Sequence, residues 1–185
     1  MEKNKEIRIH GRGGQGAVTA AELIAVAAFY DGKFSQAFPN FGVERRGAPV
    51  MAYVRISDEA IRLREQVYTP DYLIIQDPTL ITTTPEILSG LDKCSGILIN
   101  SEKTDWPQFK GKRVLIVPAT KIALEKIGKP FMNTALVGAF AAMSGLVSLK
   151  SLQKAIEERF PAEVAKANIE AMISASTCLT ECGTN

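Results

Sequence analysis

Short apolar runs alternate with longer segments of helical periodicity along the chain. Six runs rich in branched and aromatic residues predict strands, and they cover residues 6–10, 33–38, 49–56, 71–77, 96–100 and 113–119. Residues 17–30 predict a helix that is apolar on almost every side. Three further helices are expected at 133–147, 148–160 and 161–176, with serines suited to N-capping at the start of the second and Pro161 at the start of the third.

This alternation predicts an α/β fold, a Rossmann-like mixed sheet flanked by helices with a helical C-terminal third. The run at 49–56 follows the run at 33–38 without an intervening helix, so some antiparallel pairing is expected. The C-terminal helices should pack on one face of the sheet. The helix at 17–30 should lie between the sheet and a second surface, for which a partner subunit is one candidate. Residues 180–185 are expected to be frayed.

Composition indicates an ordinary globular protein. With 185 residues and 46% hydrophobic content, the chain is long enough to bury a core as one domain over residues 1–185. A charged fraction of 23% and a net charge of +2 do not favour nucleic acid as a partner. No apolar run reaches the roughly 18 residues of a spanning helix, and the charged N-terminus lacks the apolar segment of a signal peptide. A cytoplasmic protein without a membrane partner is therefore expected.

Cysteine and histidine usage limits the chemistry. The three cysteines, Cys94, Cys178 and Cys182, form no C-x-x-C pair, which argues against a disulfide framework and against an iron–sulfur or zinc site. His10 is the only histidine, so a multi-histidine metal site is excluded. Because His10 lies on a predicted buried strand, a packed imidazole is favoured over a catalytic one.

The stretch "GRGGQG" joins the first predicted strand to the apolar helix. Gly11, Gly13 and Gly16 have the G-x-G-x-x-G spacing, and backbone N–H groups at a helix start attract phosphate. A tight turn without a ligand is the alternative. A dinucleotide would also need an acidic residue at the end of the second strand. Asp31 has about the right distance but precedes that strand, which weakens the hypothesis of an NAD- or FAD-dependent enzyme.

Three further groups of polar residues are candidates for a site. Arg45 and Arg46 lie in a loop suited to bidentate anion contacts, with a solvated charge pair as the alternative. Asn133 and Thr134 begin a helix, where N-capping is favoured over ligand contact. Asp77, before Pro78, marks either a turn or a ligand-facing edge.

Several stretches together resemble a known family. "GRGGQGAVTAAELIAVAA", "QAFPNFGVERRGAPVMAYVRISDEAIR", "PDYLIIQDPTL" and "NTALVGAFAAMSGLVSLKSLQKAIEERFP" are similar, in this order, to gamma subunits of the 2-oxoacid:ferredoxin oxidoreductase family. The segment "FGVERRGAP" resembles sequences of the pyruvate:ferredoxin oxidoreductase (pyruvate synthase) branch more than those of the 2-oxoglutarate branch. The resemblance covers about residues 6 to 173.

The resemblance implies a division of labour within a heterotetramer. Alpha, beta and ferredoxin-like delta subunits would hold thiamine diphosphate, Mg and [4Fe–4S] clusters and pass electrons to ferredoxin or flavodoxin. The gamma chain would bind coenzyme A and assist assembly, without activity alone; a purely structural spacer is a further alternative. On this basis the expected coenzyme A contacts are Arg12, Gly13, Gly14, Gln15, Gly16, Arg45, Arg46 and Asn133. Lys33 could reach a phosphate, but a solvated lysine is favoured.

Overall fold

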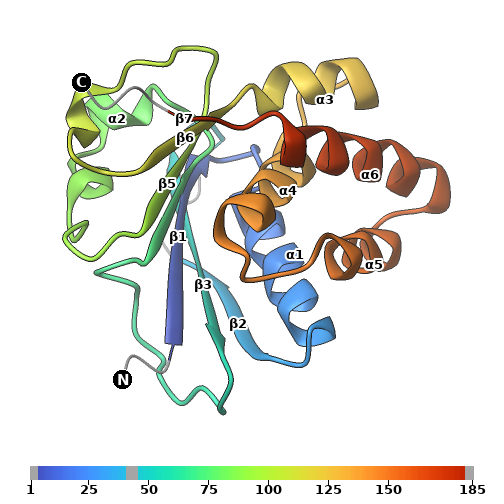
Figure 1. The fold of residues 1–185 in the computed structure, drawn as a ribbon, viewed down its shortest axis with the longest axis horizontal. Coiled ribbons are helices and arrows are strands. Elements are labelled where there is room, and N and C mark those ends of the chain that lie inside the picture. Colours follow the sequence, from blue (N-terminus) through green and yellow to red (C-terminus); the bar gives the residue numbers. More distant parts are fainter. Residues whose placement is uncertain (1–3, 41–45, 182–185) are drawn as a thin grey trace.

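The computed structural model describes residues 4–40 and 46–181. Figure 1 shows a central sheet with most of the helices on one side of it. In chain order the elements are β1 (Asn4–Arg12), α1 (Ala17–Tyr30), β2 (Phe34–Pro39), β3 (Pro49–Ser57), β4 (Tyr72–Ile75), α2 (Leu80–Thr83), η1 (Pro85–Leu88), β5 (Gly96–Asn100), η2 (Pro107–Phe109), β6 (Val114–Val117), α3 (Ala119–Ile127), α4 (Asn133–Ser144), α5 (Leu149–Arg159), α6 (Ala162–Thr177) and β7 (Thr180–Glu181).

The sheet is mixed, as the sequence predicts. Its strand order is β2-β3-β1-β4-β5-β6-β7, with β1, β4, β5 and β6 parallel to their neighbours in that group. Strand β3 runs antiparallel to both β1 and β2, which confirms the pairing expected from the missing helix between β2 and β3. The carboxyl ends of β1 and β4 therefore lie side by side, and the β1–α1 loop begins at that edge.

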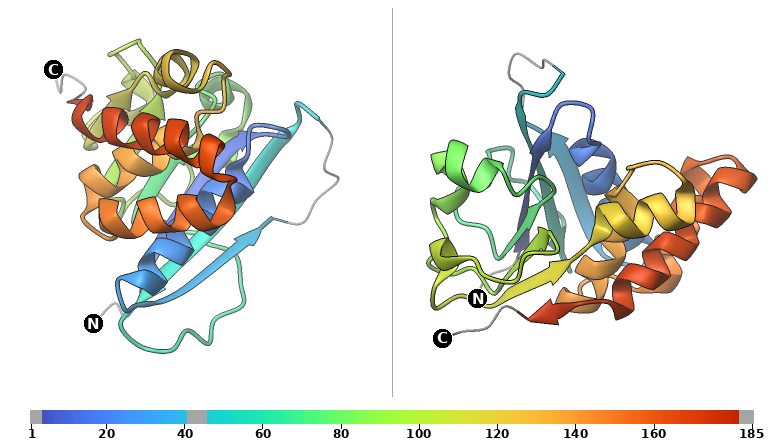
Figure 2. Two further views of the ribbon diagram at one scale, coloured as in Figure 1. Left: turned by 90° about the vertical axis from the view of Figure 1, so that its right-hand side faces the viewer. Right: turned by 90° about the horizontal axis from the view of Figure 1, so that it is seen from above.

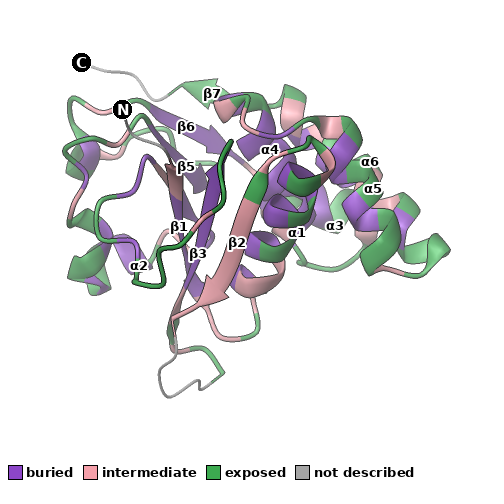
Figure 3. Ribbon diagram, turned by 90° about the horizontal axis from the view of Figure 1, so that it is seen from below, coloured by how far each residue is buried: buried purple, intermediate pink, exposed green. Residues whose placement is uncertain are grey.

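Each face of the sheet carries its own apolar cluster. One face packs against α1, α4, α5 and α6, through residues that include Ile9, Ile74 and Phe140. The other face packs against α2, η1 and η2, through residues that include Ile75, Leu80 and Phe109. Figure 2 shows the four longer helices stacked on one side, and Figure 3 shows their buried surfaces turned inward. The C-terminal helices thus lie on one face, as expected.

Helix α1 is covered by its own chain. It contacts β2 and β3 on one side and α4 and α5 on the other. Only a narrow stripe that includes Glu22, Val26 and Phe29 is exposed. The suggestion that a partner subunit covers this helix is therefore not needed, because α4 and α5 supply the second surface.

Some elements differ from the sequence expectation. Helix α3 was not predicted, nor were the short segments α2, η1, η2 and β7. Frayed ends were expected from residue 180 onward, yet Thr180 pairs with Ile116 and Glu181 pairs with Leu115 at the edge of the sheet. The expectation was wrong for these two residues because strand pairing satisfies their backbone groups. Residues 182–185 lie outside the described part of the chain.

Asp31 ties the end of α1 to the start of α5. Its carboxylate accepts hydrogen bonds from the N–H of Ser148 at 2.6 Å, from Ser148 Oγ at 2.7 Å and from Ser151 Oγ at 2.6 Å. Burial alone would raise the pKa of Asp31, but the hydrogen bonds from Ser151 and Ser148 outweigh burial and lower it. Asp31 is therefore a structural capping residue, in agreement with the expectation that it is not placed to bind a ribose.

Replacing Asp31 with alanine is expected to lower the free energy of unfolding by about 1 kcal/mol, because the start of α5 loses its acceptor. Chemical denaturation of the purified chain measures this change. The matched control is Asp105→Ala, an exposed aspartate for which the expected change stays within about 0.5 kcal/mol. Equal effects of the two substitutions would contradict the capping role.

Candidate functional site

The glycine loop between β1 and α1 has a defined backbone. Gly14 has φ of 93° and Gly16 has φ of 74°, values that side-chain-bearing residues rarely adopt. The N–H of Gly13 donates to the carbonyl of Ala48 at 2.9 Å, and the N–H of Gln15 donates to the carbonyl of Arg12 at 2.9 Å. Within residues 4–40 and 46–181, the N–H groups of Gly14 and Gly16 have no such acceptor. These two groups, at the start of a 14-residue helix, suit an anion.

The Arg12 guanidinium donates hydrogen bonds to other residues of this chain. Its Nε donates to Asp77 Oδ2 at 2.8 Å, and its Nη2 donates to Thr79 Oγ1 at 2.8 Å. Its Nη1 donates to the carbonyl of Gly47 at 3.0 Å. Three of its nitrogens are thus engaged, so Arg12 lies at the loop as expected but its charge is balanced by Asp77.

Gln15 and Asp77 complete this network. Gln15 Oε1 accepts from the N–H of Arg12 at 2.8 Å, and its Nε2 donates to Asp77 Oδ2 at 3.1 Å. Burial alone would raise the pKa of Asp77, but hydrogen bonds from Thr79, Gln15 and Arg12 lower it. The N–H of Thr79 also donates to Asp77 Oδ1, so the turn interpretation of Asp77 is confirmed.

The structure brings the two glycine-containing motifs together. The N–H of Gly47 donates to the carbonyl of Gly13 at 3.0 Å, which forms a reciprocal pair with the Gly13–Ala48 bond. Arg46 lies beside the loop, since a Cβ placed on Gly14 would be 3.9 Å from Arg46 Cγ. Arg46 is exposed, and no described residue accepts a hydrogen bond from its guanidinium. Arg45 lies outside the described residues.

Asn133 reaches the other side of the same loop. A Cβ placed on Gly16 would come within 2.3 Å of Asn133 Nδ2, so only glycine allows this approach. Asn133 is the first residue of α4 and its side chain makes no capping bond, which makes the N-capping interpretation wrong. Thr134 Oγ1 instead bonds to Asn168 Oδ1 at 2.9 Å. Asn133 Oδ1 is buried without a hydrogen-bond partner among the described residues.

Sequence reasoning missed Gln76, which lies under the loop. The residue is 1% exposed, and neither of its amide atoms has a partner in the described part of the chain. A Cβ on Gly11 would come within 2.3 Å of Gln76 Oε1. The one sequence signal is a polar residue near the end of the strand predicted at 71–77, beside Asp77; the observed strand β4 ends one residue before it, at Ile75.

His10 is buried, in agreement with a packed rather than a catalytic imidazole. It is 1% exposed, and its Nε2 has no hydrogen-bond partner within the described residues. Burial, together with the nearby charge of Arg8, lowers its pKa to about 3. A histidine whose pKa is about 3 stays neutral near pH 7 and is unsuited to acid–base exchange there.

Lys33 is not part of the loop site. Its Nζ donates to the carbonyl of Leu146 at 2.9 Å, close to the Asp31 cap. It is therefore neither a solvated lysine nor a phosphate contact, because the 14-residue helix α1 lies between the glycine loop at its start and Lys33 after its end.

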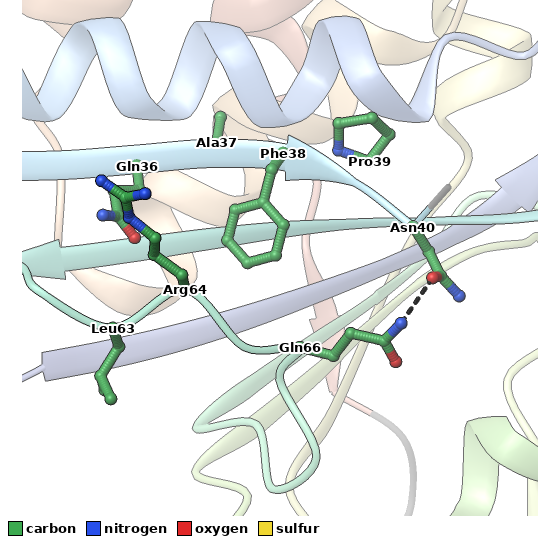
Figure 4. A pocket seen from close by; sticks show the side chains of 8 residues that line it. All are labelled: Gln36, Ala37, Phe38, Pro39, Asn40, Leu63, Arg64 and Gln66. Carbon is green, nitrogen blue, oxygen red and sulfur yellow. Dashed lines mark hydrogen bonds between the residues drawn. The ribbon is translucent and has the colours of Figure 1, made fainter. Parts of the chain in front are cut away.

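One pocket lies at the glycine loop, and a second pocket lies along β2. A pocket of about 230 Å³ lies at the loop itself, lined by Arg12, Gly13, Gly14, Gly16, Ala17, Val18 and Val50. A larger pocket of about 540 Å³ lies along edge strand β2 (Figure 4), lined by Phe38 of that strand and by Leu63 and Arg64 of the β3–β4 connection. There Gln66 Nε2 donates to Asn40 Oδ1 at 2.7 Å. Because it shares no lining residue with the loop pocket, it is a separate surface.

Residues 4–40 and 46–181 contain no group of three or more His, Cys, Asp and Glu side chains able to hold a metal ion. None of the helices in these two ranges has the length and apolar character needed to cross a membrane.

Comparison with known proteins identifies the family. The family model for pyruvate ferredoxin/flavodoxin oxidoreductase matches residues 6–178. The chain belongs to this family. The match takes in every element that carries the site, from β1 to α6, and the resemblance seen in the sequence is therefore confirmed.

Individual relatives within the pyruvate ferredoxin/flavodoxin oxidoreductase family are similar over nearly their full length. Pyruvate synthase subunit PorC of Methanocaldococcus jannaschii is 54% identical over 166 residues, which cover 90% of this chain and 92% of that protein. The common gamma subunit of the pyruvate/ketoisovalerate oxidoreductases of Thermococcus litoralis is 47% identical over 171 residues, with coverage of 90% and 92%.

A solved structure in the same family shares the fold. The crystal structure of pyruvate oxidoreductase subunit PORC from Thermotoga maritima has a TM-score of 0.86 and 37% identity, and the match covers 98% of this chain and 100% of that one. The α/β fold with a helical C-terminal part is thus confirmed. The chain is a gamma subunit of a ferredoxin-linked 2-oxoacid oxidoreductase, and other subunits complete the enzyme. This excludes the free-standing NAD or FAD enzyme.

Proposed function

We propose that this chain is the gamma subunit of a pyruvate:ferredoxin oxidoreductase and that its glycine loop binds coenzyme A. The enzyme would convert pyruvate, coenzyme A and oxidised ferredoxin to acetyl-coenzyme A, CO₂ and reduced ferredoxin. The observation that carries the proposal is the pair of N–H groups of Gly14 and Gly16 at the start of α1, with the exposed guanidinium of Arg46, which has no acceptor among the described residues, beside them.

The residues present fit a phosphate group of coenzyme A. Backbone N–H groups at a helix N-terminus bind anions, and an arginine can pair with phosphate in bidentate geometry. The Asp77 carboxylate near the loop would repel an anion, but Arg12 neutralises it at 2.8 Å. Asn133, whose Nδ2 lies beside Gly16, would donate a hydrogen bond to the phosphate through its amide N–H.

The size of the loop pocket limits what this chain binds alone. Pockets that bury a drug-sized ligand have volumes of about 300–1,000 Å³, and the pocket here has about 230 Å³. It can therefore take a phosphate or diphosphate group, while the rest of coenzyme A would lie against the surrounding surface or a partner subunit. This supports a role that combines coenzyme A binding with assembly.

Partner subunits would carry the redox chemistry. In this proposal alpha and beta hold thiamine diphosphate and Mg, which supply the decarboxylation chemistry, and the delta subunit holds [4Fe–4S] clusters that reduce ferredoxin or flavodoxin. The three scattered cysteines of this chain agree with that assignment. A cytoplasmic location is part of the same proposal.

The choice of 2-oxoacid would also lie with the partners. The name of the Thermococcus litoralis relative assigns one gamma subunit to enzymes for pyruvate and for ketoisovalerate. A gamma chain that serves two acids cannot be what distinguishes them. The 54% identical PorC relative supports pyruvate here, with another 2-oxoacid as the second candidate.

Steady-state kinetics of the assembled enzyme test the loop assignment. Arg46→Ala and Gly14→Ala are each expected to raise the KM for coenzyme A about tenfold and to leave the KM for pyruvate unchanged. The expected rise corresponds to the loss of one charge-assisted hydrogen bond in Arg46→Ala and to the loss of its positioning in Gly14→Ala. The matched control is Arg64→Ala, an exposed arginine at the β2 pocket. If both loop variants keep the parental KM for coenzyme A, the assignment is wrong.

A further inference from the structure

The Arg12 side chain links three segments that are far apart in the sequence. It leaves β1 at the glycine loop and bonds to Asp77 and Thr79 in the turn between β4 and α2. Its remaining bond goes to Gly47 in the β2–β3 connection. A guanidinium is a planar fork whose nitrogens point in fixed directions, so these bonds define the distance and angle between the segments.

The Gly47 contact fixes the residue that precedes it. The carbonyl of Gly47 accepts from Arg12 Nη1, and its N–H donates to the carbonyl of Gly13. The carbonyl of Ala48 accepts from the N–H of Gly13. Residues 47–48 are therefore held to the loop by three hydrogen bonds, and Arg46, one residue away, takes its position from them.

The electrostatics separate the roles of the two arginines. The Asp77 carboxylate pairs with Arg12 at 2.8 Å, and Gln15 donates to the same carboxylate oxygen. Since Arg12 is 29% exposed and paired, it adds little net charge to the loop. Arg46 is exposed and has no acceptor in the described part of the chain, so it carries the positive charge that an anion would meet.

We propose that Arg12 is a positioning residue, held by Asp77, that fixes the Gly47–Ala48 segment over the glycine loop and so places Arg46 at the anion site. This inference rests on the proposed binding of coenzyme A at the loop. It changes the expected role of Arg12 from a direct phosphate partner to a group that acts through Arg46.

The two roles predict opposite effects at Asp77. If Arg12 contacted the phosphate directly, Asp77→Asn would free its charge and lower the KM for coenzyme A. If Arg12 acts by position, the same substitution loosens the guanidinium and raises that KM. Arg12→Lys separates charge from geometry, because a lysine keeps the charge but cannot bond to Asp77, Thr79 and Gly47 from one planar group.

The experiment measures kcat and the KM values for coenzyme A and pyruvate with the assembled enzyme. Arg12→Lys and Asp77→Asn are each expected to raise the KM for coenzyme A about tenfold, while kcat at saturating coenzyme A and the KM for pyruvate stay within about twofold. The double variant should be no worse than either single variant, because both break one network. Arg62→Lys, in the exposed β3–β4 connection, is the matched control.

Each outcome decides between the roles. A parental KM for coenzyme A in Arg12→Lys, or a lowered KM in Asp77→Asn, overturns the positioning role. A fall in melting temperature without a selective change in that KM assigns the network to stability alone and overturns it as well. If the Arg46 and Gly14 variants raise the KM but these two do not, the loop site stands and this inference fails; if none does, the proposed function itself fails.

Discussion

Replacing Gly138 with alanine is expected to lower the free energy of unfolding by about 3 kcal/mol, the upper part of the usual range for overpacking in a core. Gly138 lies in α4 where that helix touches α6. A Cβ at this position would come within 2.2 Å of the carbonyl oxygen and 2.8 Å of the carbonyl carbon of Met172. Because these atoms belong to the backbone of α6, no side-chain rotation relieves the clash, and the two helices must separate.

The control for Gly138 is the glycine that ends the same helix. Gly145 has φ of 65°, and no atom of the described residues lies within 4 Å of a Cβ placed there, so Gly145→Ala should cost only about 1 kcal/mol of backbone strain. Denaturant unfolding of the purified chain measures both values. Met172 Cγ would also lie 2.8 Å from the new Cβ, so Met172→Ala removes that one contact but leaves the backbone oxygen at 2.2 Å. Adding Met172→Ala to Gly138→Ala should therefore not restore stability, and full recovery in that double variant would contradict the argument.

Periodicity predicted the elements that the core needs. Strands β1 to β6 and helices α1, α4, α5 and α6 lie where apolar spacing places them, because burial on a sheet or helix face requires that spacing. Periodicity does not predict which residues of different elements contact one another. The sequence around Gly138 does not show that a Cβ at this position would meet the backbone of α6 rather than solvent. That contact depends on Met172, which is 34 residues away.

The candidate site shows the same division. The spacing of Gly13 and Gly16 at a strand–helix junction indicated the loop, since local backbone chemistry determines it. The commitment of Arg12 to Asp77, 65 residues later, required the parallel pairing of β1 with β4. The same pairing buries Gln76 under the loop, and no local pattern marks an amide for that place.

Lowering the pH from 7 to 5 is expected to reduce the free energy of unfolding by about 2 kcal/mol through His10 alone. In the folded chain burial lowers its pKa to about 3, whereas in the unfolded chain the pKa is near the ordinary histidine value of 6.5. The unfolded state therefore binds a proton that the folded state does not. Stability is fully present above about pH 6.5 and is lost progressively as the pH falls toward 3.

The effect of His10 can be isolated because it is the only histidine of the chain. Asp31 and Asp77 also have lowered pKa values, so their contributions are lost only as the pH falls below the ordinary value of 3.8. Urea unfolding at pH 7 and pH 5 thus reports mainly on His10. In His10→Leu, which keeps an apolar group on the buried strand, the difference between the two pH values should nearly vanish. A parental chain equally stable at both values would mean that the imidazole takes up its proton without unfolding, and that water reaches this face of β1.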